Sequence, residues 1–129
     1  MRHRFDCRVY YEDTDMAGIV YHANFLKYIE RGRSEWVASL GLDQRVMKES
    51  AGQAFVVRRI ECDYLSPGHY GDDLTVLTRA EKASGARMVL RQEVCRGDET
   101  LFSALVTVVL LGPGGQPMRL PAELRQALA

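Results

Sequence analysis

The feature that most constrains this fold is a single long amphipathic helix followed by an uninterrupted series of strands. Apolar or small residues recur at helical spacing along residues 22–40: Phe25, Ile29, Gly32, Trp36 and Leu40. Gly41 is a natural stop for this helix, and Asn24 is its expected N-cap. A glycine inside the stripe costs about 1 kcal/mol relative to alanine. We therefore expect the helix to approach a sheet closely at Gly32.

Five segments are predicted to form strands: residues 4–11 before the helix, and residues 53–65, 73–83, 86–97 and 100–111 after it. Short turn-like stretches separate the later segments, so consecutive strands are predicted to pair antiparallel in a meander-like order. A helix with one apolar stripe has to bury it against the sheet. The sequence therefore predicts an α+β fold in which a curved five-stranded antiparallel sheet wraps around one central helix. The length fits a single domain over residues 1–129.

The last strand segment is apolar on both faces. One face carries Leu101, Leu105, Val109 and Leu111, and the other carries Phe102, Ala104, Val106, Val108 and Leu110. One helix covers only one face of a sheet, so the other face is predicted to meet a second subunit. A domain of this size has little room for a deep site of its own. Part of any active site is therefore expected to come from that second subunit.

Charge and cysteine content argue against several classes of protein. The 17 Lys and Arg residues balance 17 Asp and Glu residues, which disfavours partners such as nucleic acid or an anionic membrane. The three cysteines are widely spaced and form no CxxC pair, so neither a disulfide framework nor a zinc site is expected. The N-terminal segment lacks the apolar stretch of a signal peptide, and the apolar run 104–111 is too short to span a bilayer. A cytoplasmic protein is expected.

Acidic residues and a histidine gather in the connection before the helix: Glu12, Asp13, Asp15 and His22. The first N–H groups of a helix lack internal partners, and the helix dipole adds partial positive charge there. Such a site favours negative charge that develops on a carbonyl oxygen, and a nearby carboxylate can act as a base or nucleophile. Gly18 would let the backbone approach a substrate closely. The connection thus holds parts suited to acyl transfer.

Two other interpretations of this connection remain open. Acids before a helix commonly cap it or complement its dipole. Asp13, Asp15 and His22 are also metal-ligand types, but no H-x-x-x-H or comparable pair supports a metal site, and none is expected.

The segment YYEDTDMAGIVYHANFLKYIERGRSEW, residues 10–36, resembles the signature of the hotdog-fold acyl-CoA thioesterases. The branch it resembles contains 4-hydroxybenzoyl-CoA thioesterase and the YbgC (Tol-Pal-associated) enzymes. The shared positions are Tyr11, Thr14, Asp15, Gly18, Val20, Tyr21, Asn24, Phe25, Tyr28 and Glu30. Residues 61–74 resemble a second family segment through Tyr64, Pro67, Asp72 and Asp73. The strand and helix order also matches that fold along the whole chain.

The resemblance implies a catalytic arrangement. Asp15 corresponds to the catalytic carboxylate, acting as nucleophile or as general base on water, and the helix N-terminal amide near His22 would polarise the thioester carbonyl. The His22 side chain would assist, as in the YbgC branch, which points to aliphatic or general acyl-CoA substrates. The residues expected to line the substrate site are Gly18, Ile19, Val20, Tyr21 and Asn24. Tyr21 and Asn24 would shape the pocket or cap the helix.

The same resemblance sets expectations for partners. Arg58 and Arg59 are candidates for binding the phosphates of coenzyme A across a subunit interface, with a solvated strand face as the alternative. The implied assembly is a homo-oligomer, either a dimer or a dimer of dimers (a homotetramer). No cofactor is expected, since coenzyme A is part of the substrate. Loose association with a membrane-linked system is implied by family resemblance only.

Two other hotdog proteins are alternatives. The first is a dehydratase acting on acyl carrier protein; those enzymes resemble each other through a His…Pro-Gly segment that opens the helix, and this segment is absent here after His22. A non-catalytic subunit that binds acyl-CoA or acyl carrier protein is the second alternative. The presence of both Asp15 and His22 argues against it.

Overall fold

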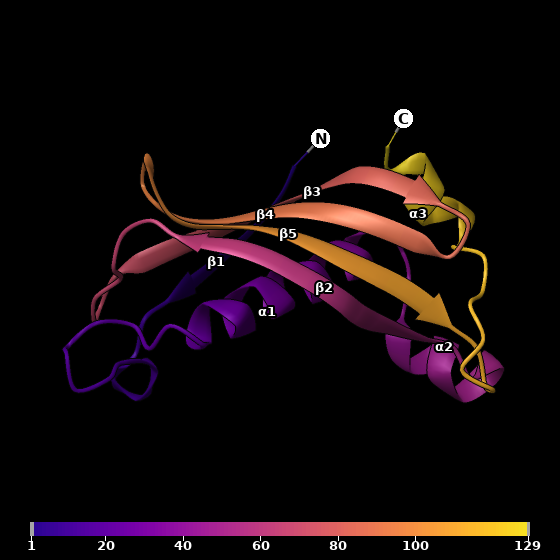
Figure 1. The fold of residues 1–129 in the computed structure, drawn as a ribbon, viewed down its shortest axis with the longest axis horizontal. Coiled ribbons are helices and arrows are strands. Elements are labelled where there is room, and N and C mark those ends of the chain that lie inside the picture. Colours follow the sequence, from indigo (N-terminus) through magenta and orange to yellow (C-terminus); the bar gives the residue numbers. More distant parts are fainter. Residues whose placement is uncertain (1, 129) are drawn as a thin grey trace.

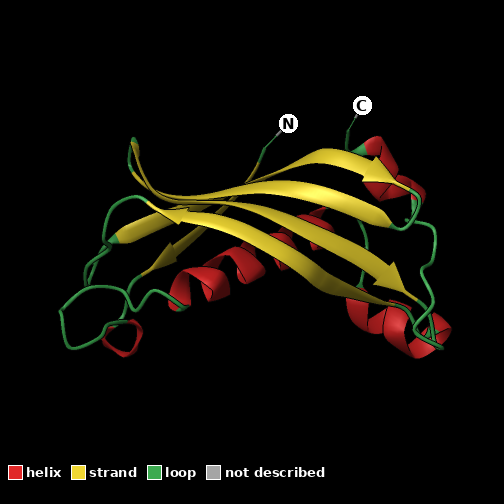
Figure 2. Ribbon diagram, viewed as in Figure 1, coloured by secondary structure: helices red, strands yellow, loops and turns green. Residues whose placement is uncertain are grey.

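The computed structural model describes residues 2–128. Its elements, in chain order, are β1 (His3–Arg8), the 3-10 turn η1 (Tyr11–Asp13), α1 (Asn24–Ser39), α2 (Gln44–Ala51), β2 (Ala54–Tyr64), β3 (Asp73–Ser84), β4 (Arg87–Arg96), β5 (Glu99–Leu111) and α3 (Ala122–Gln126). The strands form one five-stranded sheet in the order β1-β3-β4-β5-β2, and all pairs are antiparallel. The sheet curves over α1, the only long helix in the described chain (Figures 1 and 2). The predicted α+β hotdog arrangement is confirmed.

The position of β2 differs from the predicted meander. Strands β3, β4 and β5 pair in chain order, but β2 pairs with β5 and forms one edge of the sheet, while β3 lies beside β1 near the other edge. The meander prediction was wrong for this strand because residues 65–72 cross the end of the sheet instead of making a tight hairpin. The crossing loop lies at the same end of the molecule as the β1–α1 connection (Figure 1).

The core lies between α1 and the concave face of the sheet. From α1 it contains Phe25, Tyr28, Ile29, Gly32, Trp36 and Val37, and from β5 it contains Phe102, Ala104, Val106, Val108 and Leu110. The opposite face of β5 is half-buried at Leu105, Val109 and Leu111, as its alternation predicts. Leu101 was wrongly assigned to that outer face. Val94 pairs with Phe102 but Cys95 pairs with Thr100, so Leu101 lies in a bulge and is fully buried.

The close approach predicted at Gly32 is confirmed. A Cβ atom added there would lie 2.5 Å from Cγ1 of Val76 on β3, which is closer than side-chain atoms pack. The fully buried Gln92 side chain lies beside this contact, and its amide donates to the Ile29 carbonyl at 2.8 Å and to the Thr78 hydroxyl at 2.9 Å. The Arg33 guanidinium donates to the side-chain oxygen (Oε1) of Gln92 at 3.0 Å. The helix is therefore held to the sheet by steric fit and by a buried polar network.

Among residues 2–128, no helix has both the length and the apolar character needed to cross a bilayer.

Candidate active site

The connection between β1 and α1 folds back on itself around Asp15. Thr14 and Val20 form an isolated antiparallel β-bridge. The Asp15 N–H donates to the Ile19 carbonyl at 2.9 Å, and the Gly18 N–H donates to the Asp15 carbonyl at 3.0 Å. Gly18 has a φ of +78°, which non-glycine residues rarely adopt, so glycine suits this turn. The exposed Asp15 carboxylate accepts one hydrogen bond, from the Ala17 N–H at 2.9 Å, and no other within residues 2–128. One carboxylate oxygen is therefore free for chemistry.

Asp13 has a structural role in the same connection. Its carboxylate accepts the Tyr10 N–H at 2.8 Å, and its carbonyl accepts the Tyr21 N–H at 2.9 Å and the Asn24 side-chain amide at 3.0 Å. Asn24 is buried and its side chain points back to Asp13, so the predicted N-cap was wrong. The N-cap residue is Ala23, which makes no side-chain cap.

The start of α1 presents two free amides. The N–H groups of Asn24, Phe25 and Leu26 donate to the carbonyls of Tyr21 (2.8 Å), His22 (3.3 Å) and Ala23 (3.1 Å) respectively. The N–H groups of His22 and Ala23 have no acceptor in the part of the chain that the structure describes. These two amides form the positive end of the helix dipole and suit an oxyanion.

An aromatic cluster adjoins His22. The exposed His22 ring lies 4.6 Å from the Tyr21 ring and 6.0 Å from the Tyr64 ring, measured between centroids. The Tyr64 hydroxyl donates to the His22 carbonyl at 3.1 Å. The Tyr64 ring also packs 5.0 Å from Phe102, which stacks on Phe25. Sequence reasoning gave Tyr64 no site role, although its place in the family-like segment 61–74 was a signal.

The crossing loop, residues 65–72, packs against the turn around Asp15 (residues 14–20, the Asp15 turn) and supports it. The Val20 N–H donates to the Gly68 carbonyl at 2.8 Å, and Ile19 bridges His69. Gly68 is buried, and a Cβ there would lie 2.9 Å from the Val20 side chain. Val20 itself is buried, so its side chain belongs to the core, and Ile19 is half-buried.

The sequence profile of the thioesterase superfamily matches residues 17–103. The chain belongs to this superfamily. The acyl-CoA thioesterase YbgC of Haemophilus influenzae is 36% identical over 124 residues, which cover 95% of this chain and 91% of that protein. Thus the resemblance seen in the sequence is confirmed.

Solved structures give the same fold for this superfamily member. A probable thioesterase from Bartonella henselae superposes with a TM-score of 0.90 at 37% identity, over 94% of this chain and all of that one. A 1,4-dihydroxy-2-naphthoyl-CoA thioesterase from Synechocystis also gives 0.90, at 25% identity, over 99% of this chain and 96% of that one.

Arg96, at the end of β4, anchors the crossing loop. Its guanidinium donates to Asp72 at 2.7 Å and to Glu99 at 2.6 Å, and the Asp72 carboxylate also accepts the His69 N–H at 2.8 Å. Burial acts to raise the pKa of Asp72, but the His69 N–H and Arg96 more than offset burial, so this pKa is lowered. The ion pair thus stabilises the loop that braces the Asp15 turn.

Removing this ion pair is expected to make the free energy of unfolding less sensitive to a fall in pH through the acid range. A lowered folded-state pKa means that Asp72 stabilises the fold above its unfolded pKa, near 4, and that this contribution is lost as pH falls through the folded pKa. Arg96→Gln should therefore lower the free energy of unfolding at pH 7, and this loss should shrink progressively below about pH 4. Urea unfolding between pH 7 and pH 2.5 measures the difference. Arg79→Gln, which loses only the exposed 3.7 Å contact with Glu81, is the control; an equal and pH-independent loss in both variants would contradict the assignment.

Arg58 and Arg59 lie away from the Asp15 turn within one chain. Both are exposed on the edge strand β2, where the register shifts between Val57 and Arg59, and Arg59 pairs with Glu61 at 2.9 Å. Tyr64 at the site lies five positions after Arg59, or roughly 17 Å along a strand. A role for either arginine at the same chain's turn is therefore not supported, and contact across a subunit interface stays a prediction.

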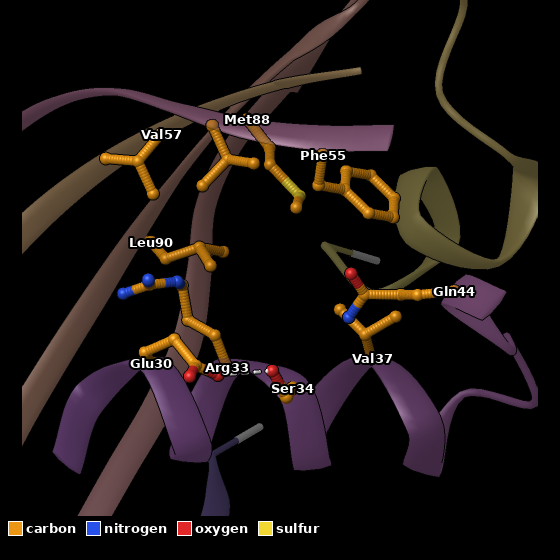
Figure 3. A pocket seen from close by; sticks show the side chains of 10 residues that line it. Glu30, Arg33, Ser34, Val37, Gln44, Phe55, Val57, Met88 and Leu90 are labelled. Carbon is orange, nitrogen blue, oxygen red and sulfur yellow. Dashed lines mark hydrogen bonds between the residues drawn. The ribbon is translucent and has the colours of Figure 1, made fainter. Parts of the chain in front are cut away.

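A cavity of about 270 Å³ lies between α1 and the sheet (Figure 3). Its α1 wall is polar, with Glu30, Arg33 and Ser34, and the Ser34 hydroxyl donates to Glu30 at 2.7 Å. The facing wall is apolar and consists of Phe55, Val57, Met88, Leu90 and Val108. Val37 and Gln44 complete the lining. Neither Asp15 nor His22 lines this cavity.

Proposed function

We propose that this protein hydrolyses acyl-CoA thioesters to a free acid and coenzyme A. The observation that carries the proposal is one short connection that holds both an accessible carboxylate, Asp15, and two unpaired N–H groups at the start of α1. The Haemophilus relative is named an acyl-CoA thioesterase, and the Synechocystis neighbour acts on an aromatic acyl-CoA. These names support the reaction class.

The proposed chemistry needs few groups. The His22 N–H, at the positive end of the helix, polarises the thioester carbonyl and stabilises the oxyanion. Asp15 either attacks the carbonyl carbon, forming a mixed anhydride that water later hydrolyses to the free acid and the regenerated carboxylate, or takes a proton from water, whose oxygen then forms the new C–O bond. The C–S bond breaks, the thiolate of coenzyme A leaves, and a proton converts it to the thiol.

The proposed substrate-binding surface includes more than one chain. Gly18, Ile19, Tyr21 and Asn24 surround or support the Asp15 turn and the helix start. Val56 and Val57 on the edge strand β2 are about two-fifths exposed, which favours contact with another subunit. We infer that a second copy completes the site, in a dimer or a dimer of dimers, and that Arg58 or Arg59 reaches coenzyme A from there.

A panel of acyl-CoAs tests the function. Purified protein is mixed with aliphatic acyl-CoAs of increasing length and with 4-hydroxybenzoyl-CoA, and a thiol-reactive dye reports released coenzyme A. Release above the protein-free rate supports the thioesterase. Binding of acyl-CoA without thiol release would favour the non-catalytic acyl-CoA-binding alternative. Thiol release only from acyl carrier protein thioesters would show that the substrate is an acyl carrier protein thioester instead of an acyl-CoA.

The His22 side chain is expected to contribute less than Asp15. His22→Ala removes the ring but keeps the backbone N–H, so we expect kcat to fall about 10- to 100-fold. Unchanged kcat and KM would show that the His22 ring does not contribute, so that His22 acts only through its backbone N–H. Ala23→Pro is the companion variant: Ala23 has a φ of −67°, which proline adopts, and its N–H has no partner in residues 2–128. Activity within about tenfold of wild type assigns the oxyanion to the His22 N–H, whereas a loss of 100-fold or more would assign it to Ala23.

A further inference from the structure

We propose that Tyr64 is a positioning residue that orients the free amides at the start of α1; this inference rests on the proposed thioesterase function. Tyr64 is the last residue of β2, and its hydroxyl donates to the His22 carbonyl at 3.1 Å. This hydrogen bond joins residues that are 42 positions apart in the chain. It ties the C-terminal end of β2, where the crossing loop begins, to the turn that carries the oxyanion donors.

The start of α1 lacks the usual means of fixation. Its N-cap, Ala23, makes no side-chain cap, and the Phe25 N–H reaches the His22 carbonyl only at 3.3 Å. N-cap side chains stabilise the first turn of a helix, so an uncapped first turn frays more readily. The Tyr64 hydroxyl supplies a second, shorter hydrogen bond to the same carbonyl from the end of strand β2.

Holding the His22 carbonyl also sets the direction of an amide. The carbonyl of His22 and the N–H of Ala23 belong to one planar peptide unit, so fixing one fixes the other. A hydrogen bond to a carbonyl oxygen also polarises the peptide and strengthens its N–H as a donor. The His22 N–H lies one peptide earlier, and its direction depends on the same backbone turn.

The Tyr64 ring is itself held in place. It packs edge-on against Phe25 and His22, each 6.0 Å away between centroids, and against Phe102 at 5.0 Å. The side chain is nevertheless about half exposed. Partial burial, with Cys62 nearby, raises the pKa of the Tyr64 phenol. A tyrosine hydroxyl is protonated at neutral pH even at its usual pKa, so it can donate. A surface hydroxyl can satisfy itself with water, so fold stability alone does not require this bond.

Tyr64→Phe removes the hydroxyl and keeps the ring. We expect kcat to fall about 3- to 10-fold, KM to stay within twofold and the thermal midpoint to stay within a few degrees. Tyr70→Phe is the matched control, because Tyr70 is exposed in the neighbouring loop and its hydroxyl makes no hydrogen bond within residues 2–128; its kinetics should equal those of wild type. In a His22→Ala background, the Tyr64→Phe loss should persist, since the bond is to the backbone. Its disappearance there would overturn the backbone route in favour of the His22 ring.

Backbone amide exchange tests the same inference without catalysis. In Tyr64→Phe, the amides of Asn24, Phe25 and Leu26 should exchange about 3- to 10-fold faster than in wild type, while amides in the middle of β4 stay unchanged. Unchanged exchange at the helix start together with wild-type kcat overturns the proposed role. A wild-type protein that releases no thiol from any acyl-CoA would instead contradict the proposed function, and the exchange result would still decide whether Tyr64 holds the turn.

Discussion

Replacing Asp15 by asparagine is expected to abolish thioester hydrolysis while leaving the fold intact. Asparagine has nearly the same shape and keeps an oxygen that accepts the Ala17 N–H, so the turn that Gly18 allows should be preserved. It cannot serve as the proposed base or nucleophile, however. We expect kcat to fall at least about 1000-fold. The side chain is exposed, so the free energy of unfolding should change by less than about 0.5 kcal/mol. Thiol release and urea unfolding on the same preparation measure both quantities.

Two neighbouring acids sharpen this test. Glu12→Gln removes a charge from the same connection at an exposed position, and its kcat should stay close to that of wild type. Asp13→Asn alters the group that accepts the Tyr10 N–H, so its main effect should be on the free energy of unfolding and not on kcat. A pure Asp15→Asn protein with wild-type turnover would refute the mechanism. Equal losses in Glu12→Gln and Asp15→Asn would reduce the role of Asp15 to local electrostatics.

Local periodicity explains how much of the fold the sequence could predict. The stripe of α1 and the alternation along β5 are set by backbone geometry over neighbouring residues, so both were predicted correctly except at Leu101. The place of β2 was not, because it depends on which distant strand offers a matching edge. The turn-forming residues in 65–72 are compatible both with a hairpin and with a loop that crosses the end of the sheet, so composition does not distinguish the two. The bulge at Leu101 likewise follows from pairing with β4 and leaves no local signal.

The same distinction applies to the site. Asp15, Gly18 and His22 lie close together in sequence, and their residue types already suggested acyl chemistry. Tyr64 and Arg96 were missed because their contacts with His22 and Asp72 span 42 and 24 residues, and no periodic pattern reports such contacts. The two apolar faces of β5 predict a second chain, but which residues that chain brings to the site, such as Arg58 or Arg59, depends on how two surfaces meet.

Side chains added at Gly32 are expected to cause the largest loss of stability. The first added atom would lie 2.5 Å from Val76 Cγ1, and Val76 is fully buried and β-branched, so it has little freedom to rotate away. Overpacking costs about 1–3 kcal/mol, and the gain in helix propensity offsets about 1 kcal/mol of it, so Gly32→Ala should destabilise by about 1 kcal/mol. Gly32→Leu must push α1 away from β3 and break the bond from Gln92 to the Ile29 carbonyl. A loss of about 4 kcal/mol or more is expected, close to the whole stability of a small domain.

Urea unfolding of matched variants separates this steric effect from helix propensity. Ala38→Leu adds the same type of side chain at an exposed position of the same helix and should change stability by less than about 0.5 kcal/mol. Combining Gly32→Ala with Val76→Ala makes room for the new methyl group, so the double variant should be about 1 kcal/mol more stable than the two single losses predict together. Strict additivity, or a Gly32→Ala protein more stable than wild type, would show that the helix and sheet can separate at little cost. In that case the glycine would not be needed for the contact that holds α1, and with it the catalytic helix start, against the sheet.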